Sequence, residues 1–209
     1  MAAVHVAPPV LPAAPGAAAG LYNLLMAQAA GLPNDGLFAR MLASQAAGQS
    51  ALPAGLGLGW SDFRALLARH FPGYSRLAVR HGRRAAAPPL LRWQPAEQGE
   101  RCAEWDELRA LLLQHRAAAD ASETWLAGIV ATACMGGDHL WQDLGLDARS
   151  ELSVLMSRNF PGLTALNQRD MKWKRFLYKQ LCNSAGVYVC RSPSCEVCAD
   201  YAQCFGHED

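Results

Sequence analysis

Four cysteines near the carboxyl end of the chain are the residues best suited to chemistry. Cys190, Cys195, Cys198 and Cys204 follow one another with the spacing C-x4-C-x2-C-x5-C, so four sulfur atoms can converge on one site without a distant partner. Thiolates select zinc, Cu(I) or iron–sulfur clusters over hard cations such as Mg²⁺. The segment is therefore predicted to be a cysteine-rich metal-binding loop.

The spacing of these cysteines favours one class of metal site. The first three share the C-x4-C-x2-C spacing of plant-type ferredoxins, whereas structural zinc ribbons usually offer two separated C-x2-C pairs and only one occurs here. An iron–sulfur type of cluster is thus favoured over zinc. A disulfide-rich tail is disfavoured because the 7 cysteines are odd in number and the first 20 residues lack the Lys or Arg of a secretory signal.

Other cysteines and a histidine are candidate accessory ligands. Cys182 lies eight residues before the first of the four, and is interpreted either as an exchangeable fifth ligand or as a reduced cysteine packed beneath the loop. Cys134 and His139 flank a Gly-rich turn that would let a thiolate, the Asp138 carboxylate and an imidazole face one point. The alternative is that Asp138 caps the next turn and His139 is only hydrogen-bonded. Cys102 is isolated.

A basic helix is predicted immediately before the cysteines, from Asn167 to Cys182, with Asn167 as its cap. Its apolar face consists of Trp173, Phe176, Leu177 and Leu181. Lys172, Arg175 and Lys179 fall on the opposite stripe at steps of three and four, and all three lysines of the chain lie in this segment. The stripe is a candidate surface for an anion or an acidic partner; the alternative is the solvated face of an amphipathic helix.

The rest of the chain is predicted to be all-α. Apolar residues recur at helical steps, no alternating run is longer than Val187–Val189, and 51% apolar residues suffice for a core. Ser61, Ser122 and Asp147 are expected to begin three of the helices. Along the chain we predict a disordered Ala/Pro-rich tail (1–20), an N-terminal helical unit (21–79), a linker (80–100), a second helical unit (101–166), and the basic helix with the cysteine-rich segment (167–209).

The two helical units resemble each other at an offset of 88 or 89 residues. Leu56-Gly57-Leu58 aligns with Leu144-Gly145-Leu146, and Arg69-His70-Phe71-Pro72-Gly73 aligns with Arg158-Asn159-Phe160-Pro161-Gly162. We therefore predict duplicated helix–loop–helix units that each end at Phe-Pro-Gly, with chance alignment of Ala-rich helices as the alternative. Duplication would explain architecture and not chemistry.

Charge and hydropathy exclude two classes of partner. The chain has 19 Lys and Arg against 18 Asp and Glu, a net charge of +1, and so lacks the basic excess that supports nucleic-acid binding. Its apolar runs are shorter than the roughly 20 residues that a membrane-spanning helix needs. We expect a cytoplasmic protein that binds neither nucleic acid nor membrane.

Several motifs in the last third of the chain point to a known family. Asn159–Leu163, Asn167, Met171–Cys182 and Val187–Gly206 together closely resemble the C-terminal signature of the NifQ family of nitrogen-fixing bacteria. Asp138–Leu146 resembles a second family motif upstream. The remainder of the chain is similar to the family only loosely.

This resemblance implies a molybdenum carrier for nitrogenase cofactor assembly. By the family motif, Cys190, Cys195, Cys198 and Cys204 would ligate a molybdenum–iron–sulfur cluster. The family implies that molybdenum from a molybdenum source passes to the nitrogenase cofactor scaffold complex, and that the nitrogenase iron protein takes part. The chain is then expected to be a metal donor and not an enzyme. The residues alone also allow a small iron–sulfur electron-transfer protein or a zinc-stabilised interaction module.

Overall fold

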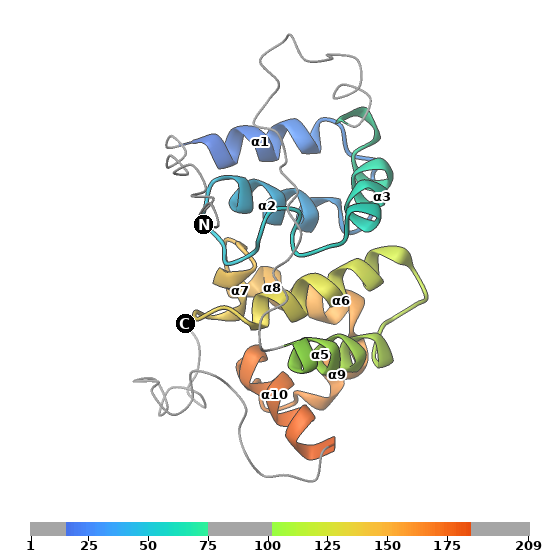
Figure 1. The fold of residues 1–209 in the computed structure, drawn as a ribbon, viewed down its shortest axis with the longest axis vertical. Coiled ribbons are helices and arrows are strands. Elements are labelled where there is room, and N and C mark those ends of the chain that lie inside the picture. The colour runs from blue at the N-terminus through green and yellow to red at the C-terminus, as the bar shows by residue number, and fades with distance from the viewer. Residues whose placement is uncertain (1–15, 75–101, 185–209) are drawn as a thin grey trace, which may run out of the picture.

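Every regular element in the described part of the chain is a helix (Figure 1). The computed structural model describes residues 16–74 and 102–184, so the predicted linker, most of the predicted tail and all four C-terminal cysteines lie outside it. The helices are α1 (Ala17–Met26), α2 (Asp35–Ala46), α3 (Trp60–His70), α5 (Cys102–Gln114), α6 (Ala121–Cys134), α7 (Leu140–Asp143), α8 (Arg149–Asn159), α9 (Pro161–Leu166) and α10 (Trp173–Ser184). The prediction of a mainly helical fold is confirmed.

The helix starts differ from the predicted ones by one to four residues. Helix α1 begins at Ala17, inside the predicted tail, and α3 begins one residue before Ser61. The cap of α6 is Asp120, whose carboxylate accepts a hydrogen bond of 2.8 Å from the backbone N–H of Ser122. Ser122 does not cap the helix because its hydroxyl is bonded to a buried histidine. Helix α8 begins two residues after Asp147.

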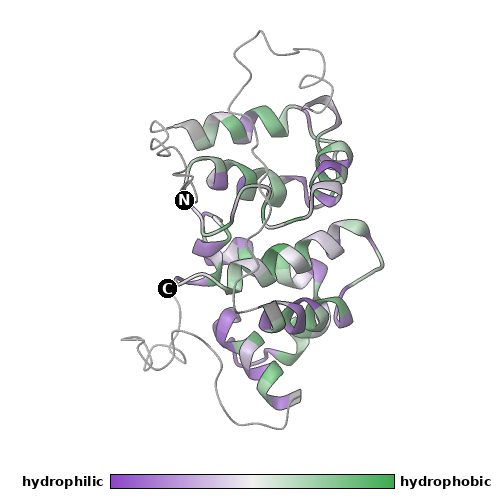
Figure 2. Cartoon of the chain, viewed as in Figure 1, coloured by the Kyte–Doolittle hydropathy of each residue, from purple (hydrophilic) through white to green (hydrophobic). Residues whose placement is uncertain are grey.

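Helix α6 lies at the centre of the hydrophobic core. Leu126, Ile129 and Val130 are fully buried, and so are residues on its other sides, which is typical of a helix that is surrounded by other elements. One continuous cluster of buried side chains joins it to residues of all the other helices. Figure 2 shows that purple and green segments alternate along α10, which therefore has only one apolar face. None of the described helices combines the length and the apolar content that a membrane crossing requires.

The helices form two units that correspond in order. In Figure 1, α1 to α3 form the upper half, α6, α7 and α8 lie at the level below them, and α5, α9 and α10 lie at the bottom. At the predicted offset, α1, α2 and α3 match α5, α6 and α8. Helices α9 and α10 extend the second unit toward the cysteine-rich segment.

Equivalent positions in the two units have the same backbone conformation. Phe71 ends α3 with φ −132° and ψ 59°, and Phe160 ends α8 with φ −134° and ψ 54°. Each phenylalanine precedes a proline, which disfavours helical geometry at the residue before it. Gly57 and Gly145 both have positive φ, 77° and 71°. These matched geometries support the predicted duplication.

The units also exchange equivalent contacts across their interface. A Cβ atom on Gly57 would lie 2.6 Å from the side chain of Thr132, and one on Gly145 would lie 2.5 Å from that of Ser44. Ser44 and Thr132 are themselves an equivalent pair at the offset of 88. Such reciprocity, in which each half contacts the other through the same positions, characterises an approximate two-fold arrangement.

Buried hydrogen bonds between the two units also join equivalent positions. The His70 ring of the first unit is bonded to Ser122 of the second, at 2.9 Å. At the equivalent positions, the Asn159 side chain of the second unit donates to Asn34 of the first, at 3.2 Å, and accepts from it at 2.7 Å. The interface between the units is therefore fixed by directional hydrogen bonds in addition to apolar packing.

We expect Gly145→Ala to destabilise the protein much more than Gly48→Ala. Gly48 has nearly the same φ, 70°, but no atom lies within 4 Å of a Cβ added there. The Gly48 variant should lose about 1 kcal/mol from backbone strain alone. The Gly145 variant should lose about 2 to 4 kcal/mol, because the added methyl group also collides with Ser44. Urea denaturation measures both, and equal losses would contradict the proposed interface packing.

Candidate functional site

Helix α10 leads from the helical body to the cysteine-rich segment. It ends at Ser184, and Cys190 follows six residues later. Six residues can span at most about 20 Å, so the end of α10 limits where the first of the four cysteines can lie. The four predicted ligands themselves are outside the described residues. The described elements that bear on the site are α10 and the residues that hold it.

The apolar face of α10 docks on the body as predicted. Trp173, Phe176, Leu177 and Leu181 are all at least 95% buried. The Trp173 and Phe176 rings meet edge to face with their centroids 5.6 Å apart, a favourable aromatic geometry. The helix is thus held along its length by apolar contacts.

The predicted start of this helix at Asn167 is wrong. Asn167 instead ends α9, and its side chain brackets a loop by donating to the carbonyl of Met171 at 2.8 Å and accepting from its N–H at 2.9 Å. Asp170 has a φ of 50°, in the left-handed region. An Asn side chain that satisfies the backbone of a turn competes with helix formation, so α10 begins only at Trp173.

The side chains of the predicted basic stripe differ in their exposure to solvent. Lys172 and Arg175 are partly buried, Lys179 is exposed, and Cys182, at the end of the stripe, is 8% exposed. Cys182 is buried in the body and forms no disulfide with a described cysteine. Both interpretations of Cys182 stay predictions, because the four candidate ligands lie outside the described residues.

Lys174, on α10, does not belong to the predicted basic stripe. Its ammonium group is almost completely buried and forms an ion pair with the carboxylate of Asp143, itself 2% exposed. The ammonium also donates to the carbonyl oxygens of Gly136, at 3.1 Å, and Asp138, at 2.6 Å. We call Lys174, Asp143 and these two carbonyl groups the Lys174 cluster. All three hydrogens of the ammonium have acceptors in it.

The turn after α6 is shaped around this cluster. A Cβ atom on Gly136 would lie 2.5 Å from the carboxylate of Asp143, so only glycine allows the chain to approach so closely. The backbone N–H of Asp138 points to the same carboxylate, at 3.4 Å. A signal was present in the sequence, since Lys174 falls between apolar positions of the helix and Asp143 belongs to the upstream family motif.

The described residues do not gather Cys134 and His139 into a metal site. The Cys134 thiol is fully buried, and burial raises its pKa to about 12, so it keeps its proton. His139 is exposed, and its backbone N–H donates to the Gln142 side chain at 3.2 Å. Helix α7 begins after His139 and not after Asp138. Within residues 16–74 and 102–184 no three His, Cys, Asp or Glu side chains are placed to bind a metal ion.

A buried Asp–His–Ser arrangement lies at the interface between the units. His70 Nδ1 is 2.6 Å from Asp35, and Nε2 is 2.9 Å from the Ser122 hydroxyl. Because a carboxylate only accepts, Nδ1 carries the proton and Nε2 accepts from Ser122. The three residues are only 1 to 4% exposed, so no substrate reaches the serine, and the arrangement is structural rather than catalytic.

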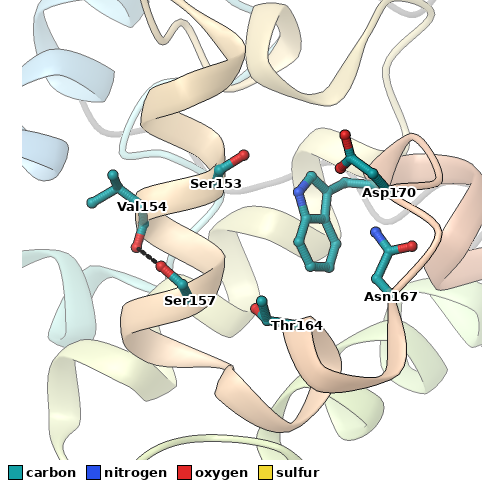
Figure 3. Close-up of a pocket in the computed structure, with 7 residues that line it drawn as sticks. Ser153, Val154, Ser157, Thr164, Asn167 and Asp170 are labelled. Atoms are coloured by element: carbon teal, nitrogen blue, oxygen red, sulfur yellow. Dashed lines mark hydrogen bonds between the residues drawn. The ribbon is translucent and has the colours of Figure 1, made fainter. Parts of the chain in front are cut away.

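An open groove of about 320 Å³ runs between α8, α9 and the start of α10 (Figure 3). It is lined by Ser153, Val154, Ser157, Thr164, Asn167, Asp170 and Trp173. The Ser157 hydroxyl donates to the Val154 carbonyl at 3.2 Å, and Asp170 pairs with Arg149 at 3.2 Å. The groove contains neither cysteine nor histidine, so it lacks the ligands that soft metals require.

Comparison with known proteins gives one consistent result. The sequence profile of the NifQ family matches residues 37–206. The protein NifQ of Azotobacter vinelandii is 47% identical over 174 residues, which cover 81% of this chain and 86% of that protein. The chain belongs to the NifQ family. The NifQ of Rhodobacter capsulatus is 36% identical over 169 residues (81% and 86% covered), and the NifQ homolog of Sinorhizobium fredii is 34% identical over 170 residues (81% and 69% covered). No solved structure matches.

The resemblance seen in the sequence motifs is therefore confirmed. The NifQ family is linked to biosynthesis of the nitrogenase molybdenum cofactor. The matched region includes the Lys174 cluster, α10 and the four cysteines, whereas α1 lies before it. The NifQ match thus covers both the helical body and the predicted metal-binding segment.

We expect His70 to make stability depend on pH. Burial lowers the pKa of His70 below its usual value near 6.5, so the native state resists protonation while the unfolded state accepts it. The free energy of unfolding should therefore be constant above about pH 7.5 and fall toward pH 5 by up to about 1.4 kcal/mol per pH unit. Urea denaturation at a series of pH values measures this.

The matched variant is His70→Asn, which introduces the residue found at the equivalent Asn159. It should be less stable at pH 8 by about 1 to 3 kcal/mol, because Asp35 and Ser122 lose a partner. Its stability should change less between pH 7 and pH 5.5. Parallel curves for the two proteins would show that His70 is not the titrating group.

Proposed function

We propose that this chain carries molybdenum in a molybdenum–iron–sulfur cluster and donates it to nitrogenase cofactor assembly. The thiolates of Cys190, Cys195, Cys198 and Cys204 hold the cluster, which is the cargo of the protein. The recipient is the scaffold complex that builds the cofactor, with participation of the nitrogenase iron protein, in the cytoplasm. The chain acts as a metal carrier and not as a turnover enzyme.

The observation that carries this proposal is the C-x4-C-x2-C-x5-C spacing within a segment covered by the NifQ match. Four thiolates form a soft, sulfur-rich donor set that suits iron and a thiophilic metal such as molybdenum. The donor chemistry therefore fits the proposed cargo.

The helical body supports the same assignment of ligands. Its fully buried cysteine, Cys134, keeps its proton up to a pKa of about 12 and so is a poor metal ligand. The body instead presents basic side chains of α10 on the way to the cysteines, with Lys179 exposed. Positive charge close to a thiolate cluster offsets its negative charge and attracts acidic partners.

Metal analysis of anaerobically purified protein separates this function from its rivals. Iron together with molybdenum supports the proposal. Iron alone favours the electron-transfer protein. The ferredoxin-like spacing of the first three cysteines also supports this alternative. Colourless protein with one zinc ion favours the zinc-stabilised interaction module and removes both others.

We expect Cys195→Ser to lose most of its iron and molybdenum while keeping its helical circular dichroism, because the described helical body ends at Ser184, before this residue in the chain. The matched control is Cys134→Ala, which removes a buried thiol of the body and should keep its metals. Elemental analysis gives both results. Unchanged iron in the Cys195 variant would refute its assignment as a ligand.

Charge reversal of the basic stripe tests the docking of an acidic partner. The double variant Lys172→Glu/Lys179→Glu should bind the nitrogenase iron protein more weakly than the wild type at low salt. The difference should shrink as ionic strength rises, because exposed charges are screened over about 10 Å at 0.1 M salt. Titration at several salt concentrations measures this, and equal affinities at low salt would exclude the stripe from the interface.

A further inference from the structure

We propose that Lys174 is a positioning residue that fixes the direction of α10, and with it the place where the cysteine-rich segment leaves the helical body. The inference rests on the proposed function in so far as that segment holds the metal. It is carried by the buried Lys174 cluster, which joins the second residue of α10 to the turn after α6 and to the last residue of α7.

Stability alone does not explain this cluster. Removing a charge pair from water costs several kcal/mol, and replacing such a pair with apolar side chains of similar size is often neutral or stabilising. Here both partners are more than nine-tenths buried. The neighbouring positions Trp173 and Leu177 on α10 are also buried, so the start of this helix has apolar packing besides the ion pair.

The cluster gives direction where apolar packing does not. The ammonium group of Lys174 is bonded to the Asp143 carboxylate and to two carbonyl groups, those of Gly136 and Asp138, at 3.1 and 2.6 Å. Hydrogen bonds fix the angle and position of a donor, whereas hydrophobic contacts are non-directional. Three acceptors around one ammonium therefore restrict the position and angle of the start of α10 beyond what its apolar contacts do.

The length of α10 amplifies any error at this point. The helix has 12 residues and so extends for about 18 Å. A tilt of about 20° at Lys174, ten residues before Ser184, would move the far end of the helix by about 5 Å. The angle of α10 at Lys174 thus sets the point from which the cysteine-rich segment leaves the helical body.

The experiment compares three variants of the full chain with the wild type. Lys174→Met removes the ammonium group and keeps the unbranched stem. Lys174→Met/Asp143→Leu replaces both charges with apolar side chains. Arg69→Met is the matched control, because it breaks an ion pair of similar length, 2.6 Å to Asp120, in which both side chains are about 40% exposed.

The first measurement needs no metal. In apo protein, hydrogen exchange of the α10 amides, compared with those of α2, should accelerate at least about tenfold in Lys174→Met, as expected for the loss of a charged hydrogen bond. Arg69→Met should leave this ratio unchanged. An unchanged ratio in Lys174→Met would overturn the proposal whatever the metal content of the protein.

The second measurement separates position from stability. Lys174→Met should lower the urea midpoint and should lose iron to a chelator roughly tenfold faster, the lower end of the effect of residues that orient metal ligands. In the double variant the midpoint should return toward the wild-type value, while loss of iron and exchange in α10 stay fast. If metal retention recovers together with the midpoint, Lys174 contributes only stability and the proposal is wrong.

The experiments distinguish failure of the proposed function from failure of the proposal about Lys174. Wild-type protein that holds neither iron nor molybdenum would refute the assignment as a metal carrier, and the exchange measurement on α10 would still decide whether Lys174 fixes this helix.

Discussion

A single buried ammonium group connects the helical body to the part of the chain that bears the cysteines. Lys174 is held by Asp143 and by carbonyl groups of the turn after α6, and Gly136 is needed because any side chain there would collide with the carboxylate. A buried charge is tolerated only when its hydrogen-bonding groups are satisfied, so the turn, the short helix α7 and the start of α10 constrain one another. The position of the start of α10 depends on this mutual constraint.

The sequence predicted the fold class and most of the helices, since apolar periodicity reports burial directly. It also predicted the ends of α3 and α8, because proline restricts the residue before it and places Phe71 and Phe160 outside the helix. It failed where side chains compete for backbone groups. Asn167 looked like a cap for a helix that follows it, yet it ends one helix and brackets a loop through Met171.

In the candidate site, too, some features could be predicted from the sequence and others could not. Four cysteines with short spacing can be recognised from sequence because their chemistry is local. The position of Lys174 between apolar residues indicates that it is buried, but its partners could not be recognised, since they lie 31 to 38 residues away in the chain. In the opposite sense, Cys134 and His139 are close in sequence, but folding buries the thiol and leaves the imidazole exposed.

The exchange of equivalent contacts between the two helical units has a consequence for the origin of the chain. Gly57 meets Thr132 as Gly145 meets Ser44, and His70 meets Ser122 as Asn159 meets Asn34. Two identical molecules would contact each other in this way in a homodimer. Fusion of two such copies would yield a monomer with its own dimer interface inside it, free to diverge in each half. On this account, His70 and Asn159 would be one diverged pair, and the cysteine-rich extension would belong to one copy alone.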